Sequence, residues 1–319
     1  MDILNWGLLS TARINRSLIP AIRASGRSRL IGVASRSTER AQAYAEDWGI
    51  EQSYGSYAAM LADPNIHVVY NALPNHLHVE WTIKAVEAGK HVLCEKPIAL
   101  TPADVTAIAD AAKSHGRIVT EGFMYRHHAR TKHVQRLLAE GILGELVLVK
   151  GAFTFTIADV HKIRLDPAMG GGSLWDVGCY PVSFARMVTG EEPEAVQALQ
   201  VLGETGVDLS LTGQMHFPSG VLAQFDCGFN APFRMEMELV GTEARMVLPK
   251  AFKPTDDTPI LMYRGDEAPE VIDVPGNLLY LDEVEDLVSA ALDGTPPLLS
   301  LAESRANVAA ITQLYEAAA

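Results

Sequence analysis

The chain lacks the residues and runs that would build a disulfide framework, a structural zinc site or a membrane span. Its three cysteines, Cys94, Cys179 and Cys227, are scattered over 319 residues, too few and too far apart for a cysteine-based site. No apolar run reaches the ~18 residues that a transmembrane helix requires. The N-terminus has no basic segment ahead of its first strand pattern, which argues against a signal peptide. We therefore expect a cytoplasmic protein with reduced thiols and no membrane partner.

Positive charge is also scarce, since 26 Lys and Arg stand against 39 Asp and Glu, for a net charge of −13. Such an excess of acidic residues disfavours a polyanionic partner, so no nucleic acid is expected. Three histidines, His127, His128 and His133, have no carboxylate or cysteine at ligand spacing, and we expect no metal. The remaining composition, 48% hydrophobic and 20% charged, is typical of a globular protein with a full core.

Short β-branched segments alternate with amphipathic helical stretches over roughly the first 120 residues, which is typical of a parallel sheet. Helices begin near Ser37 and His76 and end at Gly49 and Gly89, where glycine can adopt the left-handed conformation that closes a helix. A third helix has Thr101 as its N-cap. The expected strands are 3–8, 30–34, 68–72, 91–94 and 118–120. This half is predicted to be a doubly wound α/β domain of the Rossmann type.

The pattern changes from about Gly144 onward, where short strands follow one another directly. The expected strands are 146–150, 209–217, 221–229 and 235–240, and the turn 218–220 separates the middle two. Two helices, 278–292 and 301–318, close the chain. We predict an α+β domain with a mostly antiparallel, open-faced sheet. The expected domains are 1–122 for dinucleotide binding and 123–319 for substrate binding and oligomerisation.

The segment between the first strand and the first helix is a candidate phosphate turn. Gly7 suits a tight turn and Ala12 suits close packing of helix on strand, but Leu9 replaces the second glycine of the usual fingerprint. A purely structural turn is an equal alternative on the motif alone, whereas the helix N-terminus favours an anion. The residues expected at this turn are Gly7, Ser10, Thr11, Ala12 and Arg13.

The second strand is followed by Ser35, Arg36 and Ser37, with Arg40 one helical turn later. NAD sites usually carry an acidic residue here for the ribose hydroxyls, and this chain has none at that place. Serine and arginine donors suit a 2′-phosphate, so NADP is the expected cofactor and NAD remains possible. The alternative is that Ser37 is only an N-cap and both arginines are solvated.

Two more loops are expected at the same edge, because they also follow predicted parallel strands. The carboxyl ends of such strands are where open α/β sheets bind ligands. The first loop contributes Leu73, Pro74, Asn75 and His78, and the second contributes Glu95 and Lys96.

Two segments resemble the Gfo/Idh/MocA family of oxidoreductases. One is Glu95-Lys96-Pro97 at a strand end, and the other is the Gly-rich segment 170–180, which holds Asp176 and Tyr180. The opening segment, 6–14, is similar to the branch that contains dihydrodiol dehydrogenase, D-xylose dehydrogenase and glucose-fructose oxidoreductase. The resemblance covers essentially the whole chain. It implies a nicotinamide-dependent enzyme acting on a sugar, polyol or related diol, and a homodimer or homotetramer packed through the C-terminal sheet.

Hydride transfer at a carbon that bears oxygen requires a proton to leave or reach that oxygen. A tyrosine titrates near ~10, and a nearby ammonium lowers its pKa, so Lys96 and Tyr180 form a plausible acid–base unit. Asp176, four residues before Tyr180 and on the same face of a helix, is assigned to orienting the substrate hydroxyl or Lys96. The alternative is that Asp176 is a helix cap, Tyr180 is core and Lys96 is a surface charge.

The family resemblance also implies a substrate pocket that includes Tyr125 and Arg126, with Lys96, Asp176 and Tyr180 contacting substrate. Arg164 resembles an arginine placed near cofactor or substrate, although a surface salt bridge is an alternative. Which sugar fits depends on side chains such as Phe155 and His161, and spacing alone leaves this open. The competing hypothesis is a non-catalytic sensor that binds nicotinamide on the same fold.

Overall fold

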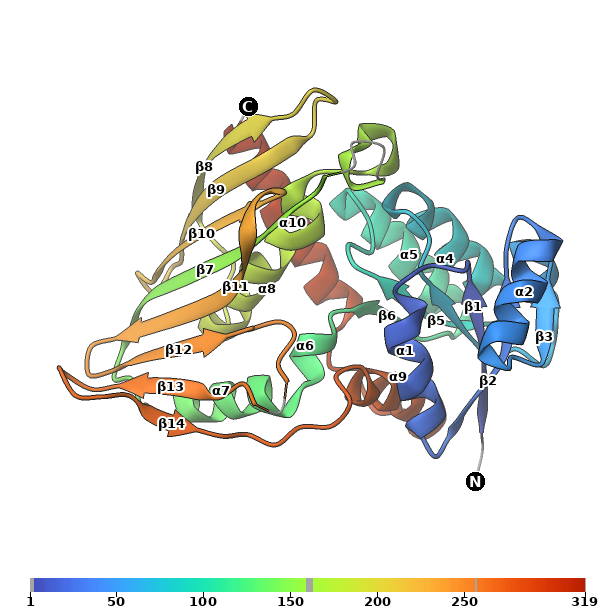
Figure 1. The fold of residues 1–319 in the computed structure, drawn as a ribbon, viewed down its shortest axis with the longest axis horizontal. Coiled ribbons are helices and arrows are strands. Elements are labelled where there is room, and N and C mark those ends of the chain that lie inside the picture. Colours follow the sequence, from blue (N-terminus) through green and yellow to red (C-terminus); the bar gives the residue numbers. More distant parts are fainter. Residues whose placement is uncertain (1–2, 159–162, 256, 319) are drawn as a thin grey trace. The chain divides into compact units, whose positions relative to one another are not determined.

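The computed structural model describes residues 3–158, 163–255 and 257–318 (Figure 1). The chain divides into two compact units, and each is described by itself. The first unit comprises residues 1–127 and 278–305, and the second comprises residues 128–277 and 306–319. The domain boundary expected after residue 122 lies slightly earlier than this division. The return of residues 278–305 to the first unit is not indicated by the sequence pattern.

The first unit is built on a six-stranded sheet in the order β3-β2-β1-β4-β5-β6, and its strand pairs are parallel. The strands are β1 (Leu4–Leu9), β2 (Ser28–Ala34), β3 (Gln52–Tyr54), β4 (Val68–Asn71), β5 (His91–Glu95) and β6 (Val119–Gly122). All five expected strands are confirmed, and β3 is additional. The strand order reverses between β1 and β4, which is the switch point where such sheets bind ligands.

The helices of the first unit begin and end largely where their capping residues predict. They are α1 (Asn15–Ala24), α2 (Thr38–Trp48), α3 (Tyr57–Leu61), η1 (Asn75–Leu77), α4 (His78–Glu87), α5 (Pro102–His115), α6 (Met124–His127) and α9 (Leu281–Asp293). Ser37 and Thr101 accept hydrogen bonds from the backbone of the first turns of α2 and α5, and Gly49 closes α2 with a φ of 59°. These three predicted caps are confirmed.

Helix α9 belongs to the first unit because it packs on α1 and α6. Arg27, just after α1, forms an ion pair of 2.8 Å with Asp293 and donates a hydrogen bond of 2.8 Å to Ser289. Val284, Leu287 and the other apolar side chains on one face of α9 are buried. This contact pattern explains why a segment so late in the chain returns to the Rossmann unit.

The second unit contains an eight-stranded sheet in the order β14-β13-β12-β11-β7-β10-β9-β8, antiparallel except where β10 pairs with β7. The strands are β7 (Leu146–Thr156), β8 (Ala195–Leu202), β9 (Asp208–His216), β10 (Leu222–Gly228), β11 (Asn230–Gly241), β12 (Arg245–Pro249), β13 (Ile260–Tyr263) and β14 (Glu270–Ile272). The helical segments are α7 (Ala129–Ala139), η2 (Ile163–Leu165), η3 (Pro167–Met169), η4 (Leu174–Gly178), α8 (Cys179–Thr189) and most of α10 (Leu301–Ala318). The predicted fold class is confirmed.

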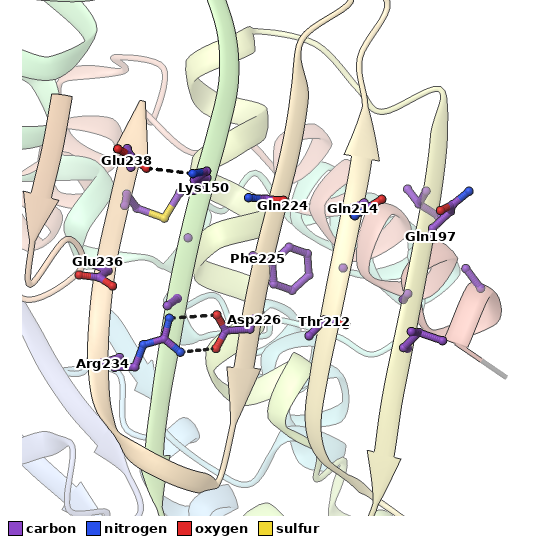
Figure 2. A pocket seen from close by; sticks show the side chains of 18 of the residues that line it. Lys150, Gln197, Thr212, Gln214, Gln224, Phe225, Asp226, Arg234, Glu236 and Glu238 are labelled. Atoms are coloured by element: carbon purple, nitrogen blue, oxygen red, sulfur yellow. Dashed lines mark hydrogen bonds and ion pairs between the residues drawn. The ribbon is translucent and has the colours of Figure 1, made fainter. Parts of the chain in front are cut away.

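One face of this sheet packs against helix α8, since a Cβ at Gly151 of β7 would lie 2.8 Å from Pro181 of α8. Other side chains line a hollow of about 930 Å³ over strands β7 to β11 (Figure 2). A row of polar residues crosses this hollow in register from strand to strand. The row is Gln197, Gln214, Gln224, Lys150 and Glu238.

Candidate functional site

The phosphate turn differs from its prediction in one respect. Strand β1 continues to Leu9 and helix α1 begins only at Asn15, so Gly7 lies inside the strand. The prediction that Gly7 makes the tight turn is wrong. A Cβ at Gly7 would lie 2.7 Å from the sulfur of Met60 and 3.3 Å from Ile66. Close packing above the strand, rather than backbone conformation, therefore favours glycine at this position.

The turn itself is made by Ser10, which has a φ of 89°, a conformation uncommon outside glycine. Its N–H donates to the carbonyl of Ala34 at 3.0 Å, and its hydroxyl donates to the carbonyl of Ala72 at 3.2 Å. Its own carbonyl accepts a hydrogen bond of 2.8 Å from Asn15. Ser10 thus ties the end of β1 to the ends of β2 and β4 and holds the turn in one shape.

The N-terminus of α1 has the features of an anion site. It has no side-chain cap and no acidic residue in its first turn, so its dipole is not offset locally. Thr11 and Ala12 are half-buried in the turn that leads into the helix, and Arg13 is exposed beside them. Hydroxyl, backbone N–H and guanidinium donors at a helix N-terminus suit a pyrophosphate. The donor set fits the dinucleotide that the sequence predicts.

Of the residues after β2, Ser37 caps a helix and two arginines carry exposed charges. Ser37 accepts a hydrogen bond from the N–H of Arg40 at 3.2 Å and donates one of 2.7 Å to Glu39, so its role as an N-cap is confirmed. Arg36 and Arg40 are exposed. Both charges act to lower the pKa of Tyr57, although burial, the larger effect, raises that pKa. The two guanidinium groups therefore lie close together, where they could bind a phosphate.

The loops after β4 and β5 complete this edge of the sheet. Leu73 is buried, and Pro74 and Asn75 lead into the short helix η1. Glu95, the last residue of β5, accepts a hydrogen bond from the buried hydroxyl of Tyr70. Lys96 follows at once and is half-buried. In the first unit, the predicted nucleotide loops and Lys96 therefore leave neighbouring parallel strands at one edge.

His78 opens α4, and its ring is buried at 1% exposure. Its Nδ1 lies 2.7 Å from the carbonyl oxygen of Pro97, and its Nε2 lies 2.7 Å from the carbonyl oxygen of Leu73. The ring thus joins the two loops to one another.

In the second unit, the Gly-rich segment leads into a helix that is not α-helical throughout. Residues 174–178 form a π-helical turn that contains Asp176, and α8 begins at Cys179, so Tyr180 lies in its first turn. The expectation that Asp176 and Tyr180 share an α-helix is therefore corrected. Single π turns of this kind are frequent at functional sites, where they shift the direction of side chains.

A buried carboxylate holds the start of this π turn. Asp208, 2% exposed, accepts hydrogen bonds from the hydroxyl of Ser173 at 2.7 Å, the N–H of Leu174 at 2.8 Å and the hydroxyl of Tyr315 at 2.7 Å. Gly172 has a φ of 128°, and a Cβ there would lie 2.3 Å from Asp208. The sequence pattern does not indicate Asp208 or Tyr315, since nothing local in either segment marks its contact.

Asp176 and Tyr180 have different surroundings. The carboxylate of Asp176 accepts a hydrogen bond of 2.5 Å from Nε of Arg164, whose side chain is half exposed. The salt bridge expected as one alternative for Arg164 is therefore present, and its partner is Asp176. Tyr180 is 4% exposed, and its ring lies 5.4 Å from that of Phe153 and 5.1 Å from that of Phe252. Tyr180 thus belongs to an aromatic cluster with little water around it.

Tyr125 and Arg126, predicted to contact substrate, lie in and beside the core of the first unit. Tyr125 is fully buried and packs edge-on against Phe123 at 6.1 Å. Arg126 forms an ion pair of 3.1 Å with Glu303. His161 lies outside the described residues.

The three histidines that follow have separate surroundings. His127 is buried 4.0 Å from Asp286, His128 caps α7, and His133 contacts Arg136 at 2.8 Å. Within the described ranges, no group of three or more His, Cys, Asp or Glu side chains is arranged to hold a metal ion. Across the same ranges, no helix is long and apolar enough to cross a bilayer.

Both parts of the chain match models of one protein family. Residues 4–123 match an oxidoreductase family with an NAD-binding Rossmann fold, GFO/IDH/MocA, and residues 131–247 match the GFO/IDH/MocA C-terminal domain. The chain belongs to the GFO/IDH/MocA oxidoreductase family. The family resemblance predicted from the sequence, the enzyme class and the nicotinamide-binding fold are confirmed.

Several relatives of this GFO/IDH/MocA protein have a named activity. D-xylose 1-dehydrogenase (NADP(+)) 2 of Haloferax volcanii is 36% identical over 319 residues, which cover 98% of this chain and 97% of the relative. Trans-1,2-dihydrobenzene-1,2-diol dehydrogenase of Bos taurus is 32% identical over 257 residues, 79% of this chain and 76% of the relative. The solved structure of a 3-ketoreductase from Actinomadura kijaniata with NADP and TDP-benzene has a TM-score of 0.93 at 27% identity and covers 99% of this chain and 98% of its own.

Proposed function

We propose that this protein is an NADP(H)-dependent oxidoreductase that moves a hydride between nicotinamide and a CH–OH or C=O group of a sugar, polyol or related diol. The observation that carries the proposal is the position of Lys96, which follows β5 at the same edge as the nucleotide loops. Relatives named for NADP or for sugar and diol substrates support both the cofactor and the substrate class.

In the proposed reaction, a nicotinamide held by the loops after β1, β2, β4 and β5 would supply the hydride chemistry, in either direction, at the substrate carbon. Tyr180 takes the hydroxyl proton as the C=O bond forms, and returns a proton in the reverse direction. The ammonium of Lys96 favours the phenolate form of Tyr180. Asp176, held by Arg164 at 2.5 Å, orients the substrate hydroxyl. The aromatic cluster around Tyr180 excludes water, which strengthens these charge interactions.

A feature of the ketoreductase from Actinomadura kijaniata supports the same pair. Among its solved structures, one carries a substituted lysine and another a substituted tyrosine, and these positions are as far apart in its chain as Lys96 and Tyr180 are here. We propose the corresponding roles for Lys96 and Tyr180.

The test is a spectrophotometric screen of aldoses, inositols, keto-sugars and dihydrodiols with NADP and NAD, followed by variants on the best substrate. Lys96→Ala and Tyr180→Phe should each lose turnover while cofactor binding, measured by fluorescence titration, is retained. Lys113→Ala, at an exposed position of α5, is the matched control and should behave as the unchanged protein. Full turnover in Lys96→Ala would refute the catalytic proposal and favour a cofactor-binding sensor.

We also propose that the protein assembles as a homodimer or homotetramer through the hollow face of the second unit's sheet. Four of the five charged side chains that line this hollow form pairs within the chain, Lys150 with Glu238 at 3.4 Å and Arg234 with Asp226 at 2.7 Å, and the fifth is Glu236 (Figure 2). Burial against a second copy would therefore leave no unpaired charge among these four groups. Leu199, 78% exposed, supplies apolar area at the same hollow, and a self-complementary patch suits two-fold symmetry.

A further inference from the structure

The ring of His78 makes more contacts with acceptors than a neutral imidazole can satisfy. Carbonyl oxygens of Pro97 and Leu73 lie 2.7 Å from its two nitrogens. A neutral imidazole carries one N–H, and only the imidazolium form carries two. In the neutral form, therefore, a nitrogen lone pair faces one of the carbonyl oxygens and that contact is repulsive. Both contacts are favourable only when the ring is protonated.

The surroundings of the ring oppose that second proton. Burial is the largest effect, and the charges of Lys96 and His76 act in the same direction, so that the pKa of His78 falls to about 4 although the two carbonyl oxygens raise it. Lys96 comes from the loop after β5 and His76 from η1. Elsewhere on α4, Glu80 and Lys84 pair with each other at the surface. Helix α5, packed on α4, carries its charged Asp110 and Lys113 on exposed positions.

A buried polar network fixes the backbone at His78. The amide of Asn71 donates hydrogen bonds of 3.1 Å to the carbonyl of His78 and to the hydroxyl of Thr82, and its oxygen accepts one of 3.3 Å from the N–H of Leu73. Asn71 and Thr82 are fully buried. The backbone around His78 is thus held in place, so a change in the ring's hydrogen bonds acts on the two loops rather than on α4.

We propose that His78 is a positioning residue that sets the Lys96–Pro97 peptide against the Leu73–Asn75 loop. Both loops meet the ring, because the carbonyl oxygens of Pro97 and Leu73 lie 2.7 Å from its two nitrogens, and the neutral ring donates its one N–H to one of them. The consequence for turnover rests on the proposed function, whereas the contacts of the ring do not.

The closeness of the Lys96 ammonium to the ring can be measured without activity. Nitrogen NMR on protein labelled at histidine gives the pKa of His78 in the unchanged protein and in Lys96→Met, which removes the charge and keeps the length of the side chain. We expect the pKa of His78 to rise by about one unit in Lys96→Met. Lys84→Met, at the exposed pair on α4, is the matched control and should leave it unchanged. An unchanged pKa in Lys96→Met would overturn the proposal, whatever the enzyme's substrate proves to be.

The positioning role can be tested by two substitutions that each keep one contact. The amide of asparagine replaces Nδ1 and can keep the bond to Pro97, while the amide of glutamine replaces Nε2 and can keep the bond to Leu73. His78→Gln should lower kcat at least about tenfold with little change in cofactor affinity, since it releases the Lys96 loop. His78→Asn should retain most of kcat and weaken cofactor binding. Equal losses in both variants, in proportion to their thermal stability, would show a merely structural role and overturn the assignment.

Discussion

The hydroxyl of Tyr315 donates a hydrogen bond of 2.7 Å to the carboxylate of Asp208. Asp208 also accepts bonds from Ser173 and Leu174, so helix α10 is connected through one buried carboxylate to the segment that carries Asp176. The ring of Tyr315 lies 5.6 Å from that of Trp175, which adds a contact at the π turn. The direction of the π turn thus depends on a residue four positions from the end of the chain.

Substitutions of Tyr315 and Asp208 should lower the free energy of unfolding by different amounts. Tyr315→Phe removes one donor and should lower the free energy of unfolding by about 1 kcal/mol. Asp208→Ala leaves the buried donors of Ser173, Leu174 and Tyr315 without their acceptor, and should cost about 3 kcal/mol or more. Urea unfolding followed by fluorescence measures both, and Asp208→Asn, which keeps an acceptor, is the control. Equal costs for Asp208→Ala and Tyr315→Phe would contradict the network.

Cofactor preference should depend on the two arginines after β2. Removing Arg36 or Arg40 by substitution with alanine should weaken NADP binding about tenfold each, because a charge-assisted hydrogen bond contributes about 1.5–3 kcal/mol. NAD binding should change little, since NAD lacks the 2′-phosphate. Titration of both cofactors checks this, with Arg29→Ala, at an exposed pair with Glu51, as the control. A clear preference of the unchanged protein for NAD would refute the assignment of these residues.

The five predicted strands of the first unit are largely buried runs, whereas β3, which was not predicted, is mostly exposed. Ser37, Gly49 and Thr101 mark helix ends by local chemistry, and local chemistry is visible in sequence. Gly7 shows the limit of such reasoning. Its glycine is favoured by contact with Met60, which lies in a helix far along the chain, whereas the positive φ falls on Ser10, where sequence statistics would not place it.

The second unit was predicted less completely for a physical reason. Strands β12, β13 and β14 span five, four and three residues, which leaves few positions for an alternating pattern, and β8 at the other edge of the sheet is mostly exposed. Asp208 supports the π turn from 35 positions away along the chain. A buried contact of that separation leaves no local pattern. The amphipathic pattern of α9, likewise, predicts a buried face but not which unit buries it.

Assembly should be sensitive to charge at the centre of the hollow. Gln224→Lys places a charge beside Gln214 and Lys150 in the cross-strand row, and an unpaired charge is costly to bury in an interface. We expect the molecular mass from light scattering to fall to that of a monomer. Gln42→Lys, on an exposed position of α2, should leave the mass unchanged. A monomeric unchanged protein would contradict assembly through this face.

Acid should destabilise the protein through His91. Its Nδ1 accepts a hydrogen bond of 3.0 Å from the N–H of Ile118, and burial, followed by the charges of Arg117 and His67, lowers its pKa to about 4 from 6.5. Because the pKa of His91 is depressed in the folded state, its contribution to stability is fully present above pH 6.5 and is lost as the pH falls from 6.5 toward 4. His91→Asn keeps an acceptor near Nδ1 and removes the titration. The urea midpoint should therefore change less between about pH 8 and about pH 5 in His91→Asn than in the unchanged protein. An equal change in both proteins would refute the role of His91.

Alkali should act on a different group, Glu283 in α9. Its side chain is 2% exposed, and its Oε1 has no hydrogen-bond partner among the described residues. Burial foremost, and then the charges of Glu95 and Asp286, raise its pKa well above the ordinary value. The pH dependence is opposite to that of His91. Because the pKa of Glu283 is raised in the folded state, the stability that Glu283 contributes is present below its unfolded-state pKa and is lost as the pH rises through its folded-state pKa.

Glu283→Gln keeps the shape and removes this loss, since the amide cannot ionise. The variant should become progressively more stable than the unchanged protein as the pH rises from about 6 to about 9, measured by urea unfolding at each pH. Glu285→Gln, at a half-buried position of the same helix, is the control. Parallel stability curves for Glu283→Gln and the unchanged protein would show that Glu283 binds the same number of protons in the folded and unfolded states over this range, and would contradict a raised pKa for Glu283.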